Sequence, residues 1–208
     1  KALVVMENMI MFSEDATYVG HMTIKNMQVN GNALADTCIK IGHPTKHCPH
    51  NIIDECQITN ATNIGILCSP FEYTTISNSK ISSCTNYGIR TLANTAGVPN
   101  GSSTISNCLI YSNGINLDIG DASIVVVENT VIYNENIIDA GVNDYLVAIH
   151  DSFEVTLLDC IFEGQEALNE AVVKVYSKDS YTSRINFTRC KSIGHVKAND
   201  IFKLGGTE

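Results

Sequence analysis

A six-residue phrase of apolar and polar positions recurs along the chain. It reads as an apolar residue, any residue, a polar residue that is often Asn, a small residue, any residue, and a second apolar residue. The copies are IKNMQV (24–29), IDECQI (53–58), ISNSKI (76–81), ISNCLI (105–110), VENTVI (127–132), LLDCIF (157–162) and FTRCKS (187–192). Successive copies begin 22 to 30 residues apart, and the last is the weakest because it ends in Ser192. Such self-similarity indicates a repeat architecture.

A second, alternating phrase lies between the copies of the first. It appears as IKI (39–41), ILC (66–68), IRT (89–91), LDI (117–119), VAI (147–149), VKV (173–175) and FKL (202–204). Alternation with β-branched residues predicts strands, and only residues 163–171 suggest a turn or two of helix. Each repeat then holds about three strands of ~10–17 Å. That length is too short for a sandwich and fits one circuit of a solenoid.

Stacked circuits explain a loose period beside a strict phrase, because loops vary in length while like residues stack on like. One predicted interior column is Ile24, Ile53, Ile76, Ile105, Val127, Leu157 and Phe187. A second is Met27, Cys56, Ser79, Cys108, Thr130, Cys160 and Cys190. The polar positions form a bend between two strands: Asn26, Glu55, Asn78, Asn107, Asn129, Asp159 and Arg189. Asn tolerates turn conformations, so we expect an asparagine ladder at this bend.

The phrase TISNCLI followed by NGINLDI, like TISNSKI followed by NYGIRT, resembles the right-handed parallel β-helix repeat of the pectin-lyase-like superfamily. The resemblance runs from about Val4 to Leu204. It implies an all-β chain, with residues 1–208 forming a single parallel β-helix domain of about seven circuits. Both ends are strand-like, so we expect them to continue into, or be capped by, other structure. The superfamily includes polysaccharide lyases, epimerases, glycoside hydrolases, phage tailspikes and adhesins, which implies a carbohydrate ligand.

Charge and hydropathy limit the classes of partner that the protein is expected to bind. The net charge of −9 opposes binding to nucleic acid and to anionic lipid surfaces. No apolar run approaches the ~18–20 residues of a membrane helix, so we expect no membrane insertion. The expected partner is a polysaccharide or another glycan, and the uncapped ends allow a homotrimer or a larger assembly. The resemblance places such a protein outside the cell, at the cell surface or on a virion.

In the resembled superfamily, substrate lies along the sheet that carries the second phrase or in clefts made by the loops that flank it. The middle residue of each copy faces outward, which gives the column Lys40, Leu67, Arg90, Asp118, Ala148, Lys174 and Lys203. Candidate catalytic residues gather where this column carries charge. They are Arg90, Asp118, His150, Asp151 and Lys174. Tyr87 and Tyr145 come just before their strands and are candidate sugar-stacking residues.

Two chemistries suit this set. Lyase or epimerase chemistry on a uronic acid would use His150 as base and Arg90 or Lys174 to stabilise the developing dianion. Hydrolysis would use a carboxylate pair, Asp118 with Asp151 or Asp121. The non-functional alternative is that Arg90 and Asp118 form a surface ion pair that contributes at most ~1 kcal/mol to stability.

Departures from enzyme motifs weaken the catalytic interpretation. The chain has no Arg-x-x-Arg-x-Pro run and no clustered calcium-binding aspartates, as a pectate lyase would have. The Gly-His-Gly of polygalacturonases appears only as GHM (20–22), GHP (42–44) and GHV (194–196), and YLVAIHDSFE lacks the Asp-Pro-His-Glu of uronan epimerases. We therefore favour a non-catalytic or weakly catalytic recognition module, tailspike-like or adhesin-like. A carbohydrate-active enzyme is the alternative.

Cysteines and histidines suggest two further sites. Of eight cysteines, four fall in the second interior column and are expected to be small buried residues. Cys38, Cys48, Cys68 and Cys84 lie near loop ends, and Cys48 with Cys68 is the favoured bridge. The stretch GHPTKHCPH (42–50) holds donors suited to zinc or copper. Corresponding loops carry no His, so we expect a surface loop there, with no metal and no cofactor.

Overall fold

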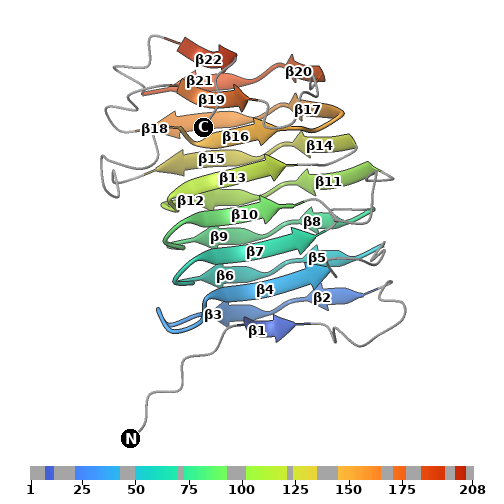
Figure 1. Ribbon diagram of the computed structural model, residues 1–208, viewed down its shortest axis with the longest axis vertical. Helices are drawn as coiled ribbons and strands as arrows, with labels where there is room; N and C mark the ends of the chain where they lie inside the picture. Colours follow the sequence, from blue (N-terminus) through green and yellow to red (C-terminus); the bar gives the residue numbers. More distant parts are fainter. Residues whose placement is uncertain are drawn as a thin grey trace, which may run out of the picture.

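Three parallel β-sheets form the protein in a computed structural model, and the chain coils through them in turn (Figure 1). The structure describes residues 8–11, 22–42, 50–69, 73–92, 102–120, 124–134, 145–164, 171–176, 184–194 and 200–204. These residues contain strands and turns but no helix, and hence none able to span a membrane. The parallel β-helix class predicted from the sequence is confirmed.

The strands of each sheet pair in the order in which the chain reaches them. Sheet A contains β1 (Asn8–Met11), β4 (Thr37–Gly42), β7 (Ile64–Ser69), β10 (Tyr87–Thr91), β13 (Ile115–Gly120), β16 (Val147–His150), β19 (Ala171–Tyr176) and β22 (Asp200–Leu204). Sheet B contains β2 (Thr23–Lys25), β5 (Ile52–Asp54), β8 (Thr75–Ser77), β11 (Ser102–Ser106), β14 (Ile124–Glu128), β17 (Glu154–Leu158) and β20 (Arg184–Thr188). Sheet C contains β3 (Gln28–Asn30), β6 (Gln57–Thr59), β9 (Lys80–Ser82), β12 (Leu109–Tyr111), β15 (Val131–Asn134), β18 (Ile161–Gly164) and β21 (Lys191–Ile193). The six-residue phrase therefore spans sheets B and C, and the second phrase lies in sheet A.

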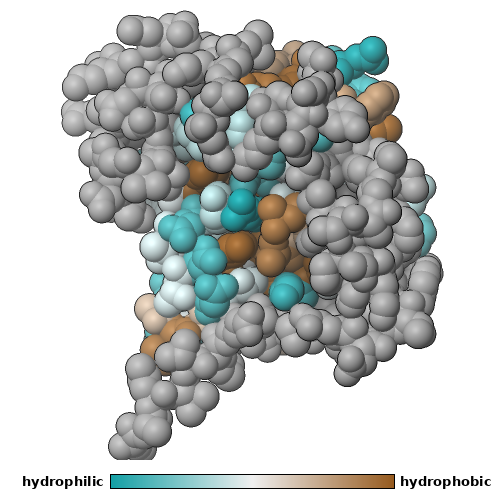
Figure 2. Space-filling model, viewed as in Figure 1, coloured by the Kyte–Doolittle hydropathy of each residue, from teal (hydrophilic) through white to brown (hydrophobic). Residues whose placement is uncertain are grey.

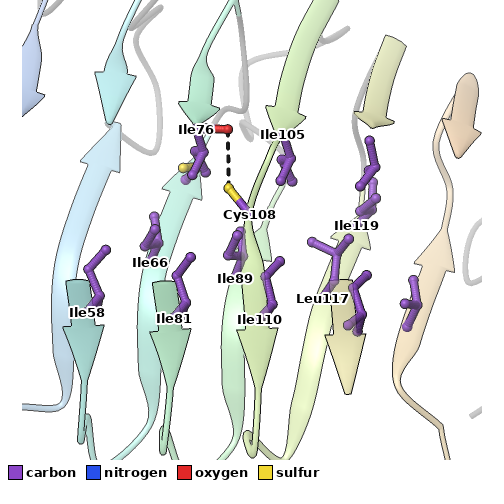
Figure 3. Packing of buried hydrophobic residues seen from close by; sticks show 14 of the residues in the cluster. Ile58, Ile66, Ile76, Ile81, Ile89, Ile105, Cys108, Ile110, Leu117 and Ile119 are labelled. Carbon is purple, nitrogen blue, oxygen red and sulfur yellow. Dashed lines mark hydrogen bonds between the residues drawn. The ribbon is translucent and has the colours of Figure 1, made fainter. Parts of the chain in front are cut away.

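The core consists of aliphatic columns that run along the stack (Figure 3). Ile53, Ile76 and Ile105 of the predicted first column are fully buried, and neighbouring circuits place them in register. Sheet C contributes a matching column that includes Ile58, Ile81 and Ile110. The close vertical packing of β-branched side chains suits parallel strands that are buried on their inner face.

The bend between sheets B and C is made as predicted. All seven polar residues of the phrase have positive φ, between 47° and 56°. Short polar side chains tolerate this left-handed conformation better than β-branched ones. The side-chain ladder lies at a different corner, between sheets C and A. There Asn86 donates to Asn63 Oδ1 at 3.0 Å, and Asn63 donates to Asp36 Oδ1 at 3.2 Å.

Three expectations need correction. Met27 is 43% exposed rather than interior, because it joins β2 and β3, which are edge strands of their sheets. Residues 161–164 and 171–176 are strands, so the ends of the expected helical segment continue the solenoid, and residues 165–170 lie outside the described part. Cys68 is a free, fully buried thiol, which rules out the bridge with Cys48, itself outside the described residues.

The remaining described cysteines are also free thiols, and Cys38 and Cys84 are fully buried. Burial raises the pKa of Cys84 to about 12, so it stays a neutral thiol. Of the histidine-rich stretch, residues 43–49 lie outside the described part. His50 stacks on Tyr73 with ring centroids 5.0 Å apart. The described residues hold no group of three or more potential metal ligands.

Candidate functional site

Charged and aromatic side chains gather on the outward face of sheet A, over β10, β13, β16 and β19. The strand register puts Arg90 beside Asp118, then Ala148, then Lys174, one on each successive strand. His150 lies two residues further along β16 and is in register with Gly120 and Tyr176. Four of the predicted site residues thus lie on four adjacent strands, and the fifth, Asp151, directly follows β16.

An ion pair and a hydrogen bond meet at Asp118. Arg90 Nε lies 3.0 Å from Asp118 Oδ2, but its N–H bond is not aligned with that oxygen, so the contact is ionic. His150 Nε2 lies 3.1 Å from Asp118 Oδ1. A carboxylate only accepts, so this hydrogen bond requires the proton on Nε2. Asp118 therefore holds Arg90 with one oxygen and His150 with the other.

The second ring nitrogen of His150 is less tightly held. His150 Nδ1 lies 3.7 Å from Asp151 Oδ2, which is too long for a hydrogen bond, and this buried nitrogen has no hydrogen-bond partner among the described residues. Asp151 adopts a left-handed backbone with φ of 46° as the chain leaves β16. The His150 ring also stacks on Tyr176, with centroids 5.1 Å apart.

A glycine makes room for this histidine. A Cβ added at Gly120 would overlap the His150 ring, so the ring lies over the backbone of the neighbouring strand. Gly120 itself is fixed from inside the solenoid, where Thr91 Oγ1 accepts from its N–H at 2.8 Å and donates to its carbonyl at 2.9 Å. His150 can therefore reach diagonally across β13 to Asp118.

Aromatic rings accompany the cations on this face. The Arg90 guanidinium lies 4.2 Å from the centroid of the Tyr87 ring. Lys174 Nζ lies 5.0 Å from the centroid of Tyr145 and 5.6 Å from that of Tyr176. Such contacts favour a cation over the ring face. The rings also pack with Ile115 and Ala148 in a second apolar cluster outside the main core.

A family model described as a right-handed beta helix region matches residues 10–191. The chain belongs to the right-handed β-helix family. Comparison with curated proteins and with solved structures finds no match. The predicted resemblance is therefore confirmed at the level of this family, which makes the coil right-handed. Any function has to be argued from the arrangement of the site.

Burial divides the site of this β-helix protein into two layers. Asp118, His150 and Asp151 are buried, with His150 only 2% exposed. Arg90, Tyr87 and Lys174 are partly exposed, whereas Tyr145 is buried and so presents no open ring face. Figure 2, in the same view as Figure 1, shows hydrophilic and hydrophobic residues side by side on the described part of the visible face. The exposed side chains can contact a ligand, and the buried side chains hold the exposed ones in place.

The burial of His150 limits the chemistry that this residue can perform. A general base must come within hydrogen-bond reach of the proton it removes, and His150 is enclosed. The Arg90–Asp118 contact is also no ordinary surface pair, because the Asp118 side chain is 3% exposed. Sequence reasoning missed Tyr176 and Gly120. Their register with His150 was the available signal, since both occupy the same outward column.

Proposed function

We propose that this β-helix protein is a non-catalytic polysaccharide-recognition module that binds an acidic glycan along the outward face of sheet A. The observation that carries the proposal is the cationic and aromatic layer of Tyr87, Arg90 and Lys174 above the buried Asp118–His150 pair. An extracellular, cell-surface or virion location, with tailspike-like or adhesin-like use and assembly as a homotrimer or a larger oligomer, is part of the proposal.

Charge supports the acidic ligand. The chain carries a net charge of −9, yet the outward column of sheet A holds Lys40, Arg90 and Lys174 against Asp118. A carboxylate-bearing polymer would find local positive charge there, and Arg binds carboxylates with a fixed fork of donors. Tyr87 lies against the same guanidinium and adds apolar surface for a sugar ring.

Spacing supports a polymer rather than a small molecule. Arg90 and Lys174 are three strands apart in sheet A, which is ~14 Å at the usual strand separation. That distance spans a few sugar units. Both cations sit on strands rather than loops, so the separation is fixed before the ligand arrives and the entropic cost of binding is reduced.

The test is glycan binding by paired variants. Wild-type protein is titrated with a panel of uronans and acidic capsular polysaccharides. Arg90→Ala and Lys174→Ala should each weaken binding by about tenfold, the loss expected for one charge-assisted hydrogen bond. Lys80→Ala is the matched control, because Lys80 is an exposed cation on sheet C. Equal losses in all three variants, or no binding to any acidic glycan, would contradict the proposal.

One observation favours the enzymatic alternative: the His150–Asp118 hydrogen bond leaves His150 Nδ1 without a partner among the described residues. A lyase would release unsaturated, ultraviolet-absorbing products, and a hydrolase would release reducing ends. The binding module is expected to give neither from any polymer of the panel. Product that disappears in His150→Ala would make this site catalytic.

A further inference from the structure

The second interior column holds one pair of cysteines in neighbouring circuits. It contains, in order, Cys56, Ser79, Cys108, Thr130, Cys160 and Cys190. Ser79 and Thr130 separate the first three cysteines from one another, and only Cys160 and Cys190 are adjacent. The residues on both sides of Cys160 and Cys190 are in register: Leu158 with Thr188, and Ile161 with Lys191. The Lys191 N–H also donates to the Cys160 carbonyl at 2.9 Å.

This register sets the separation of the two residues. Neighbouring parallel strands lie ~4.8 Å apart. Cα atoms joined by a disulfide are usually about 4.4–6.8 Å apart, so the pair falls within the range. Cys108 is two circuits from Cys160, at ~9.6 Å, and falls outside it.

The thiols lie close to the same strip of backbone. Cys190 Sγ lies 3.3 Å from the carbonyl oxygen of Leu157, which belongs to the circuit of Cys160. Cys160 Sγ is shared between the carbonyls of Val127, at 3.4 Å, and Leu158, at 3.5 Å. The two thiols are close enough to interact, since besides burial the Cys190 side chain is among the groups that raise the pKa of the Cys160 thiol.

The two cysteines differ in access. Cys190 is the only described cysteine that is not buried, because it lies beside the edge strands β20 and β21. Cys160 is fully buried. An external reagent therefore meets Cys190 first.

We propose that Cys160 and Cys190 form an intramolecular disulfide, a cross-link between neighbouring circuits, on exposure to a low-molecular-weight disulfide such as oxidised glutathione. The Cys190 thiolate attacks one glutathione sulfur, forming a mixed disulfide and releasing one glutathione thiolate. The Cys160 thiolate then attacks the Cys190 sulfur and releases the second glutathione. Overall, two protein thiols are oxidised to one disulfide, and oxidised glutathione is reduced to two glutathione molecules.

The second step should be slow near neutral pH. Burial raises the pKa of the Cys160 thiol to about 12, and the neighbouring Cys190 thiol acts in the same direction. Only the thiolate attacks. Below that pKa its fraction grows tenfold for each pH unit, so the mixed disulfide should convert to the cross-link about tenfold faster for each unit of pH.

The experiment incubates the full chain with oxidised glutathione and maps the products by mass spectrometry. Cleavage after Lys, Arg and Glu puts Cys108 in residues 91–128, Cys160 in residues 155–163, and Cys190 with Lys191 alone. The expected product joins the last two fragments and lacks two hydrogen atoms. Cross-linking should raise the thermal midpoint by roughly 5–10 °C, reversibly with a reductant.

Two variants complete the test. Cys108→Ser removes a thiol from the same column and should still give the cross-link, whereas Cys190→Ser should give neither cross-link nor stabilisation. A mixed disulfide at Cys190 that does not convert to the cross-link as the pH is raised, a bond from Cys190 to any other cysteine, or a bond between two chains would overturn the proposal. The mapping of wild-type protein decides even if a variant fails to fold.

Discussion

At the scale of single residues, one corner explains much of the sequence. The polar residue of each phrase takes a left-handed conformation, and the small residue after it turns a donor back toward the carbonyl two positions earlier. Cys56, Ser79, Cys108 and Thr130 make this contact at 3.3, 2.6, 3.3 and 2.9 Å. Cys, Ser and Thr alternate there because each is small and carries a donor.

Gly120 is the single residue on which the buried layer of the site depends most directly. Gly120→Ala should force the His150 ring away from Asp118 and destabilise the fold by about 1–3 kcal/mol, the usual cost of overpacking. Urea denaturation measures the effect. In a His150→Ala background the added methyl group has room, so the same change should cost little. Equal costs in the two backgrounds would show that the clash with His150 is not the cause.

At the scale of elements, side chains on the outer face of sheet B tie strands together. Asp54 of β5 binds Lys25 of β2 at 2.7 Å and accepts hydrogen bonds from Ser77 and Asn78, each at 2.8 Å. The Lys25 bond, with those from Asn78 and Ser77, lowers the pKa of Asp54 to about 2. This carboxylate therefore favours the folded state when it is ionised.

The sign of the pH dependence follows. Asp54 titrates near 3.9 when unfolded, so its contribution is complete above that pH and is lost as the pH falls toward 2. Asp54→Asn should therefore be less stable than wild type at pH 6, and the difference should shrink between pH ~4 and ~2. Urea denaturation across this range measures it.

Glu128→Gln is the matched control. Glu128 occupies the same column of sheet B, reached from Asp54 through Ser77 and Ser106. The stability of the Glu128→Gln variant should follow the wild-type pH profile between pH ~4 and ~2, the range in which Asp54→Asn converges on wild type. A constant difference between Asp54→Asn and wild type down to pH 2 would contradict the role given to Asp54.

At the scale of the whole molecule, the phrase predicts the fold because each repeat must bury the same positions against its neighbours. Ile53, Ile76 and Ile105 could be aligned from sequence alone, and so could the pairing of Arg90 with Asp118. Exposure at the sheet edges was harder to predict, since Met27 fits the phrase but no further strand among the described residues covers it. The burial of Asp118 and Tyr145 could not be predicted either. The alternating pattern indicates whether a side chain points inward or outward, but not which side chains pack beside it.

Binding of an acidic glycan is expected to involve Arg90 directly. The chain has three arginines, Arg90, Arg184 and Arg189, and only Arg90 lies on sheet A. Arg184 and Arg189 are exposed beside Glu154 and Asp159, so they report any non-specific attraction of the polymer.

The most direct measurement is a titration of ¹⁵N-labelled protein with an acidic oligosaccharide, following the three arginine Nε–H resonances by NMR. We expect a saturable shift of the Arg90 resonance, with those of Arg184 and Arg189 unchanged. An unmoved Arg90 resonance at saturation, or equal shifts of all three, would contradict it.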